Sequence, residues 1–155
     1  MTDHVLPTPP LVPHVAPTNP YARLLLFGIR RMAAGGIGDA HAAHSFFIGF
    51  GLGYRRPLVL LRAFMSEVAR LATVKLLVAP CCCPRMSDAE AILLDAITDA
   101  CANPRGAHEA LTNLLHVREC LGLVTSAQAV AQSFTDLCMP LTDDGCMKCN
   151  RDDMN

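Results

Sequence analysis

Apolar side chains recur at a helical spacing along most of the chain. The clearest stripe follows Pro57 and consists of Leu58, Leu61, Met65, Val68 and Ala72. Residues three or four positions apart lie on the same face of an α-helix. The stripe therefore predicts a helix from Pro57 to Ala72 that buries one side.

Other stripes are bounded by residues that start and stop helices. Proline fits the first helical position, aspartate and serine accept hydrogen bonds from free backbone N–H groups, and glycine ends a helix. Ser87 and Glu90 have the spacing of a capping box, in which each side chain bonds a backbone N–H group. These signals predict further helices over residues 20–34, 39–50, 87–101, 104–122 and 125–138. The predicted fold class is all-α, a compact bundle-like or orthogonal array of about six helices.

The two ends of the chain differ from this helical part. Residues 1–19 have proline at positions 7, 9, 10, 13 and 17, which predicts a flexible arm, mobile or draped over the surface. Residues 141–155 contain four aspartates and little apolar material, which predicts an acidic, cysteine-containing disordered tail. Residues 20–140 are left as a single helical domain.

Charge divides the chain unevenly. Residues 1–86 contain nine Lys/Arg and three acids, and the remainder contains four Lys/Arg and eleven acids. Such halves face each other within one domain or pair between subunits, so an unknown protein partner or a homo-oligomer is expected. Nucleic acid is not expected as a partner, because the chain has no long basic run and few aromatic residues to stack on bases.

The apolar run over residues 32–54 is long enough to span a membrane. Asp39, His41 and His44 and six glycines within it argue against a span, so a membrane is not expected as a partner. The N-terminus lacks the pattern of a secretory signal, which predicts a cytoplasmic protein. In that reducing compartment the eight cysteines indicate thiols, metal ligands or buried small residues rather than disulfides.

Three adjacent cysteines, Cys81, Cys82 and Cys83, lie between Pro80 and Pro84. A residue before proline avoids the helical region, so the triplet is not expected to be helical. An extended strand would point Cys81 and Cys83 to one side, and a polyproline-like segment would fan the three thiols out. Only the first geometry readily supplies two sulfur ligands to one metal ion.

The position of these thiols is compatible with metal binding or thiol exchange, although acidic Asp88 and Glu90 partly offset the positive potential. The thiols precede a helix N-terminus and lie near Arg85, and positive potential favours the thiolate needed for metal binding or exchange. His41 and His44 are three residues apart on a predicted helix, so with Cys81 and Cys83 they would complete a four-coordinate site for zinc or another thiophilic metal. The structural alternative is that the cysteines are small apolar groups buried in a tight turn.

Weaker candidates lie elsewhere. His116 and Cys120 are four apart on a predicted helix, and Cys146 and Cys149 have the spacing of a chelating or redox pair. Cys101 and Cys138 fall on apolar stripes and are interpreted as core residues. No nucleophile motif and no phosphate-binding loop is present, so no catalytic residue is assigned and an enzyme is the least favoured class.

The segments 23–32, 55–62 and 79–86, above all the string Ala-Pro-Cys-Cys-Cys-Pro-Arg-Met, resemble a small uncharacterised bacterial family, a domain of unknown function. The resemblance covers residues 20–140 and implies a bacterial cytoplasmic setting, with no ligand or catalytic roles to transfer.

The leading hypothesis from the sequence is a small thiol-based metal-binding or redox-sensing protein. The alternative is a non-catalytic structural or interaction module whose cysteines are buried packing residues.

Overall fold

Helix α1 begins where Asn19 caps it. The Asn19 side chain accepts hydrogen bonds from the backbone N–H groups of Tyr21 and Ala22, and Pro20 at the first position needs no such partner. In the computed structural model, which describes residues 10–142, α1 spans Pro20–Gly35 and ends at Gly36, whose φ of 91° suits glycine. Both ends of this helix are therefore determined by local sequence.

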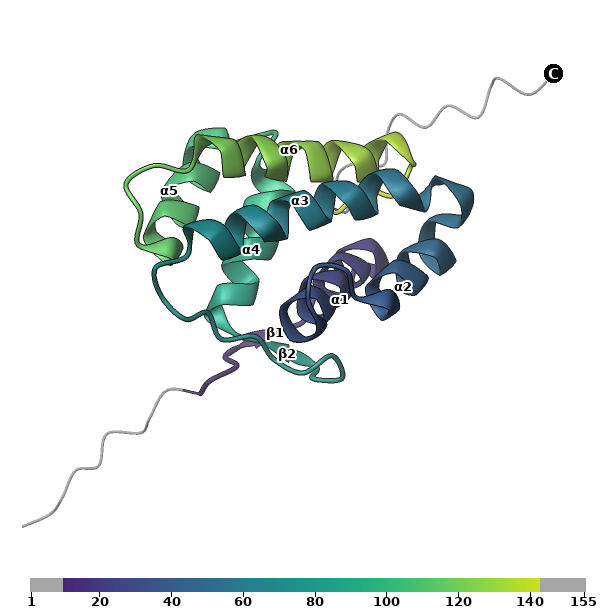
Figure 1. Cartoon of the computed structure of the whole chain (residues 1–155), viewed down its shortest axis with the longest axis horizontal. Coiled ribbons are helices and arrows are strands. Elements are labelled where there is room, and N and C mark those ends of the chain that lie inside the picture. The colour runs from purple at the N-terminus through teal and green to yellow at the C-terminus, as the bar shows by residue number, and fades with distance from the viewer. Residues whose placement is uncertain (1–9, 143–155) are drawn as a thin grey trace, which may run out of the picture.

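The remaining elements follow in chain order (Figure 1). The helices are α2 (Ala40–Phe50), the 3₁₀ helix η1 (Gly51–Tyr54), α3 (Arg55–Leu71), α4 (Asp88–Asp99), α5 (Pro104–Leu115) and α6 (Leu121–Asp136). Two short strands, β1 (His14–Val15) and β2 (Arg85–Met86), pair antiparallel. The mostly helical fold class is confirmed, and the two-stranded sheet was not predicted.

The core lies where α2, α3 and α6 meet. Figure 1 shows α3 and α6 side by side across the top of the molecule, with α1 and α2 beneath them. Phe46, Phe64 and Phe134 are fully buried, and the rings of Phe46 and Phe134 meet edge to face with centroids 6.2 Å apart. Aromatic side chains, although few in the sequence, therefore occupy the centre of the packing.

Local signals placed most helix starts correctly. Asp39 caps α2 by accepting from the backbone N–H of Ala42, and both hydrogen bonds of the Ser87–Glu90 capping box are present at α4. The predicted boundary between the last two helices is wrong. α5 ends at Leu115 because His116 takes a left-handed conformation with φ 55°, and α6 starts at Leu121 rather than Thr125. Thr125 lies inside α6, where its hydroxyl donates to the Leu121 carbonyl.

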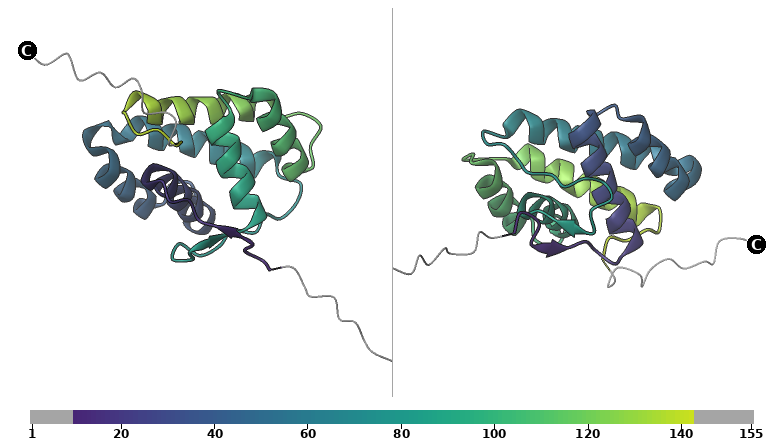
Figure 2. Two further views of the ribbon diagram at one scale, coloured as in Figure 1. Left: turned by 180° about the vertical axis from the view of Figure 1, so that it is seen from behind. Right: turned by 90° about the horizontal axis from the view of Figure 1, so that it is seen from below.

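Residues 10–19 lie along the loop that carries the three cysteines. His14 pairs with Met86 and Val15 with Arg85, and the Arg85 side chain donates to the carbonyls of Val12 and Pro13. Figure 2 shows the two strands side by side at the lower end of α4. The N-terminal segment thus supports the loop from one side, although its prolines exclude a longer strand.

Ion pairs connect the basic part of the chain to the acidic part. Arg30 pairs with Glu90, and Arg56 pairs with Asp136. His14 Nε2 lies 2.6 Å from Asp88 Oδ1. The two parts therefore face each other within one chain, which was one of the two arrangements that the charge pattern predicted. None of the helices within residues 10–142 combines the length and the apolar character that crossing a membrane requires.

Candidate thiol site

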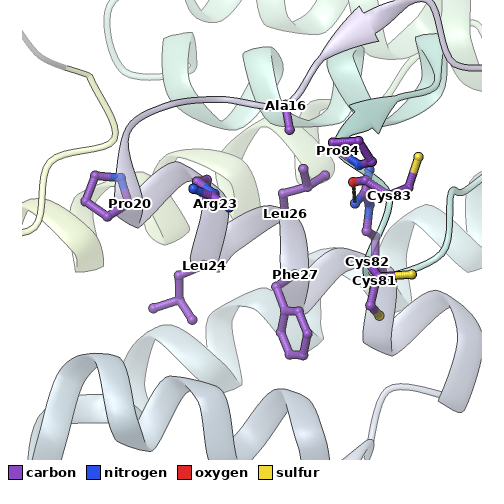
Figure 3. A pocket seen from close by; sticks show the side chains of 11 residues that line it. Ala16, Pro20, Arg23, Leu24, Leu26, Phe27, Cys81, Cys82, Cys83 and Pro84 are labelled. Carbon is purple, nitrogen blue, oxygen red and sulfur yellow. Dashed lines mark hydrogen bonds between the residues drawn. The ribbon is translucent and has the colours of Figure 1, made fainter.

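The three cysteines lie in a tight turn. The backbone N–H of Cys83 donates to the carbonyl of Pro80 over 2.9 Å, so Cys81 and Cys82 occupy the middle of a β-turn. The triplet is not helical, as predicted, but it is neither an extended strand nor a polyproline segment. Figure 3 shows the three sulfur atoms pointing in different directions. The turn therefore does not present Cys81 and Cys83 as a ready pair of ligands.

Arg30 of α1 anchors this turn through hydrogen bonds to its backbone. Its side chain is only 3% exposed, and its Nη1 and Nη2 atoms donate to the carbonyls of Cys83 and Arg85 over 2.8 and 2.6 Å. Its Nε donates to Glu90 Oε1 over 2.7 Å. A planar guanidinium can satisfy several acceptors at once, so one buried cation fixes the backbone on both sides of Pro84.

Glu90 of α4 is the counter-ion, with a fully buried side chain. Besides Arg30, its carboxylate accepts from the backbone N–H groups of Ala79 and Ser87, over 3.1 and 2.8 Å. These two residues flank the cysteine turn, so the pair Arg30–Glu90 holds the loop at its entrance, middle and exit. Among the described residues, no buried side-chain nitrogen or oxygen lacks a hydrogen-bond partner.

Sequence reasoning assigned Glu90 only its capping role and gave Arg30 no role. The capping box is a local signal, whereas Arg30 is 60 residues away in the chain. The available hint was position: Arg30 follows the buried Ile29 within the apolar part of α1. A charge placed among core residues requires a partner, but the sequence does not name it.

Arg31, the next residue of α1, lies beside Cys81. Its guanidinium donates to both carboxylate oxygens of Asp39 over 3.1 and 2.7 Å, and its Nη2 lies 3.1 Å from His41 Nδ1. The hydrogen bond with Asp39 is the main cause that raises the pKa of Arg31, and a hydrogen bond with Cys81 raises it further. The same guanidinium lowers the pKa of Asp39 to about 2. Arg31 therefore stands between the Cys81 thiol and the start of α2.

A cavity of about 420 Å³ lies between part of the cysteine turn and α1. Cys81, Cys82 and Cys83 line it on one side, and Arg23, Leu24, Leu26, Phe27 and Arg30 of α1 line the other (Figure 3). Cys82 is exposed, and Cys81 and Cys83 are half-buried. None of the three cysteines is therefore a fully buried packing residue.

The predicted four-ligand zinc site is not assembled. His41 and His44 are both exposed on α2, and His41 reaches the cysteine turn only through Arg31. Within residues 10–142, no group of three or more His, Cys, Asp or Glu side chains is placed to hold a metal ion. A guanidinium in this position would also repel a metal cation.

The second predicted pair is also separated. His116 is the exposed residue after α5, and Cys120 precedes α6, so the two do not share a helix. Cys120 instead contacts His108: its backbone N–H donates to His108 Nε2 over 3.4 Å. Burial, with a smaller contribution from Glu119, raises the pKa of the Cys120 thiol. This thiol is therefore held in its unreactive, protonated form.

The remaining predicted cysteines add no second centre to the described structure. Cys101 and Cys138 are exposed, so the prediction that they belong to the core is wrong. Cys138 is also disulfide-bonded, so the expectation of thiols rather than disulfides is wrong for this residue. Cys101 follows the last residue of α4 by two positions and is no longer on the helix face that packs inward. Cys146 and Cys149 lie outside the described residues.

Comparison with known protein families bears on this site. Residues 13–139, which include the cysteine turn, Arg30, Arg31 and Glu90, match the model named Family of unknown function (DUF6628). The chain belongs to this family. The prediction that the chain belongs to an uncharacterised family is thereby confirmed, and the DUF6628 match assigns no activity to the residues of the turn. No curated protein and no solved structure matches the chain.

Proposed function

We propose that this protein is a small thiol-based redox sensor in which Cys81 is the reactive thiol. The observation that carries the proposal is the position of Cys81, which is half-buried in the wall of an open cavity and within electrostatic reach of the Arg31 guanidinium. A cation beside a sulfur atom favours the thiolate, which is the nucleophilic form of cysteine. Partial exposure then gives an oxidant access to it.

The redox branch of the thiol hypothesis has more support than the metal branch. Redox chemistry needs one accessible thiol with a cation near it, and this proposal is supported by the half-buried position of Cys81 in the cavity wall and by the nearby Arg31. Zinc binding needs several converging ligands, and the described residues do not bring a third ligand to the turn. A cytoplasmic location is part of the proposal, because a reducing compartment returns an oxidised thiol to its resting state.

Oxidation of Cys81 would affect the rest of the protein through the hydrogen bonds of the turn backbone. Cys83, two residues after Cys81, has its carbonyl bound to Arg30, and Arg30 is tied to Glu90 of α4. A bulky group on Cys81 would displace the turn and strain these hydrogen bonds. Oxidation would thus loosen the connection between α1 and α4, which is a change that a partner protein can detect.

Competitive alkylation tests the proposal. The folded protein is treated with limiting iodoacetamide at neutral pH and digested with trypsin, which places Cys81–Cys83 and Cys101 on separate peptides, residues 76–85 and 86–105. We expect Cys81 to react about tenfold faster than the exposed Cys101. Arg31→Gln should remove most of this advantage, and Arg31→Lys should retain part of it.

Circular dichroism of each variant shows whether the helices remain intact. The proposal is rejected if Cys81 in the folded wild type reacts no faster than Cys101. It is also rejected if folded Arg31→Gln keeps the full rate, because the guanidinium would then have no effect on the thiol.

The second candidate is an interaction module that associates with a second copy of the chain. It is favoured by the exposed apolar side chains of Ile48 and Leu52, which are 69% and 93% accessible on α2 and η1. Sedimentation velocity of wild type and Ile48→Ser would show a monomer in both if this candidate is wrong. Concentration-dependent association that Ile48→Ser abolishes, together with an unreactive Cys81, would favour it over redox sensing.

A further inference from the structure

We infer that the cavity beside the cysteine turn selects small disulfides that carry carboxylates, and that Arg23 binds the carboxylate. The product would be a mixed disulfide on Cys81. This inference rests on the proposed function, because it requires a reactive Cys81 thiol. It adds the chemical class of the oxidant and a residue that determines specificity.

The charges around the cavity favour an anion. Two arginines line it, and no Asp or Glu side chain is among its lining residues. The charge of Arg30 is neutralised by buried Glu90. Within residues 10–142, the Arg23 guanidinium makes no hydrogen bond or ion pair, and Arg23 is exposed. Arg23 is thus the cation left available to a ligand among the described residues of this cavity.

The distance between Arg23 and the Cys81 thiol suits a small disulfide. Arg23, Phe27, Arg30 and Arg31 recur at helical intervals, so they face the turn from one side of α1. Arg23 and Arg31, eight residues apart, are separated by about 12 Å along the helix axis. A long arginine side chain shortens this span. The carboxylate contact and the Cys81 thiol therefore lie at opposite ends of one cavity.

Apolar side chains line the cavity between Arg23 and the Cys81 thiol. Leu24, Leu26 and Phe27 form the α1 wall between Arg23 and Arg30. The cavity volume of about 420 Å³ is within the usual range for small-molecule sites. An oxidant with an aliphatic middle and an anionic end matches this order of surfaces, whereas hydrogen peroxide would use none of them except the thiol.

The reaction is a thiol–disulfide exchange. The Cys81 thiolate attacks one sulfur of the small disulfide and forms a new S–S bond with it. The original S–S bond breaks, and its electron pair leaves with the second half of the molecule as a thiolate, which takes a proton from water. The disulfide is the oxidant, so no other reagent is needed. Arg23 acts before this step, by holding the carboxylate while the sulfur atoms meet.

The experiment compares an anionic and a neutral disulfide on the full chain. The probes 3,3′-dithiodipropionate and bis(2-hydroxyethyl) disulfide, which differ mainly in the charge of their end groups, are added separately, and mixed-disulfide formation at Cys81 and at Cys101 is followed by peptide mass spectrometry. Cys101 corrects for the intrinsic reactivity of each reagent, because it is exposed and is not among the residues that line the cavity. The preference is the ratio of anionic to neutral rates at Cys81, divided by the same ratio at Cys101.

We expect a preference of about tenfold in the wild type, reduced by added salt. Arg23→Gln should lower it to about one without changing the rate with the neutral disulfide, and Arg23→Lys should retain most of it. Arg55→Gln is the matched control, since Arg55 is exposed on α3 and does not line the cavity.

The failures of the two proposals are distinguishable. If Cys81 reacts faster than Cys101 with the neutral disulfide but shows no preference for the anionic one, the selectivity is overturned and the reactive thiol stands. An unchanged preference in Arg23→Gln likewise overturns the role of Arg23. If Cys81 reacts no faster than Cys101 with either reagent, the proposed function itself fails.

Discussion

Arg30 Nε donates to Oε1 of Glu90 over 2.7 Å, and the two side chains are 3% and 0% exposed. This buried ion pair joins α1 to α4 and carries the backbone of the cysteine turn. Removing two charges from water is costly, and the additional hydrogen bonds to Cys83, Arg85, Ala79 and Ser87 offset that cost. The pair therefore fixes the geometry of the loop more than it contributes to overall stability.

Breaking one side of this pair should be severely destabilising. Glu90→Ala leaves the Arg30 guanidinium buried without a counter-ion, and we expect a loss of about 3–5 kcal/mol in the free energy of unfolding. Urea denaturation followed by circular dichroism measures it. Glu67→Ala is the control, because Glu67 forms an exposed pair with Arg70 and its loss should change the midpoint little. A similar midpoint shift in both variants would contradict the role given to Glu90.

Asp39 should make stability depend on pH in the acid range. Arg31 holds the pKa of this carboxyl at about 2, below its usual value of 3.8. A lowered pKa in the folded state stabilises the fold above pH 3.8, and the contribution is lost as the pH falls towards 2. Asp39→Asn removes the charge but keeps an N-cap for α2, so it isolates this effect.

We therefore expect wild type to be more stable than Asp39→Asn near neutral pH. The difference in the free energy of unfolding should shrink as the pH falls from 3.8 to about 2. NMR titration of the Asp39 carboxyl gives the pKa directly. A titration at the usual aspartate value, or a stability difference that stays constant across this range, would disprove the predicted coupling to Arg31.

Cys120 should be the slow thiol of the described structure. Burial raises its pKa, so little thiolate is present at neutral pH. We expect iodoacetamide to modify Cys120 in the folded protein far more slowly than the exposed Cys101, and at an equal rate in urea. Rates taken from tryptic peptides check this. Equal rates in the folded state would mean that the segment between α5 and α6 opens readily.

Gly28 should tolerate no side chain. A Cβ there would lie 2.8 Å from Leu61 Cδ2 and 2.9 Å from Phe46 Cε2, and both of these residues are fully buried. Alanine gains helix propensity, but the overpacking is the larger effect, so Gly28→Ala should lose about 1–2 kcal/mol. Gly38→Ala, where a Cβ would meet nothing within 4 Å, is the control for thermal unfolding. Equal stability of the two variants would show that the core repacks around Gly28.

Local chemistry explains what the sequence predicted well. Asp39 and Ser87 cap the helices that follow them, and Pro20 begins α1, because each of these effects acts within one helical turn. The boundary between α5 and α6 was missed because a longer-range contact decides it. The backbone N–H of Cys120 bonds His108 of α5, and His116 takes a left-handed conformation. Together they interrupt a stretch whose apolar spacing predicts a continuous helix.

The sequence by itself determined that the chain is mostly helical, that three thiols lie in a non-helical segment between two prolines, and that α4 starts a few residues after them. Only the tertiary structure placed Arg30 and Glu90 beneath that segment and Arg31 beside Cys81. Helix periods and caps depend on neighbours a few positions away, so they can be read along the chain. The charge that faces a thiol depends on which helix packs against the turn, and that is fixed by burial of the whole core.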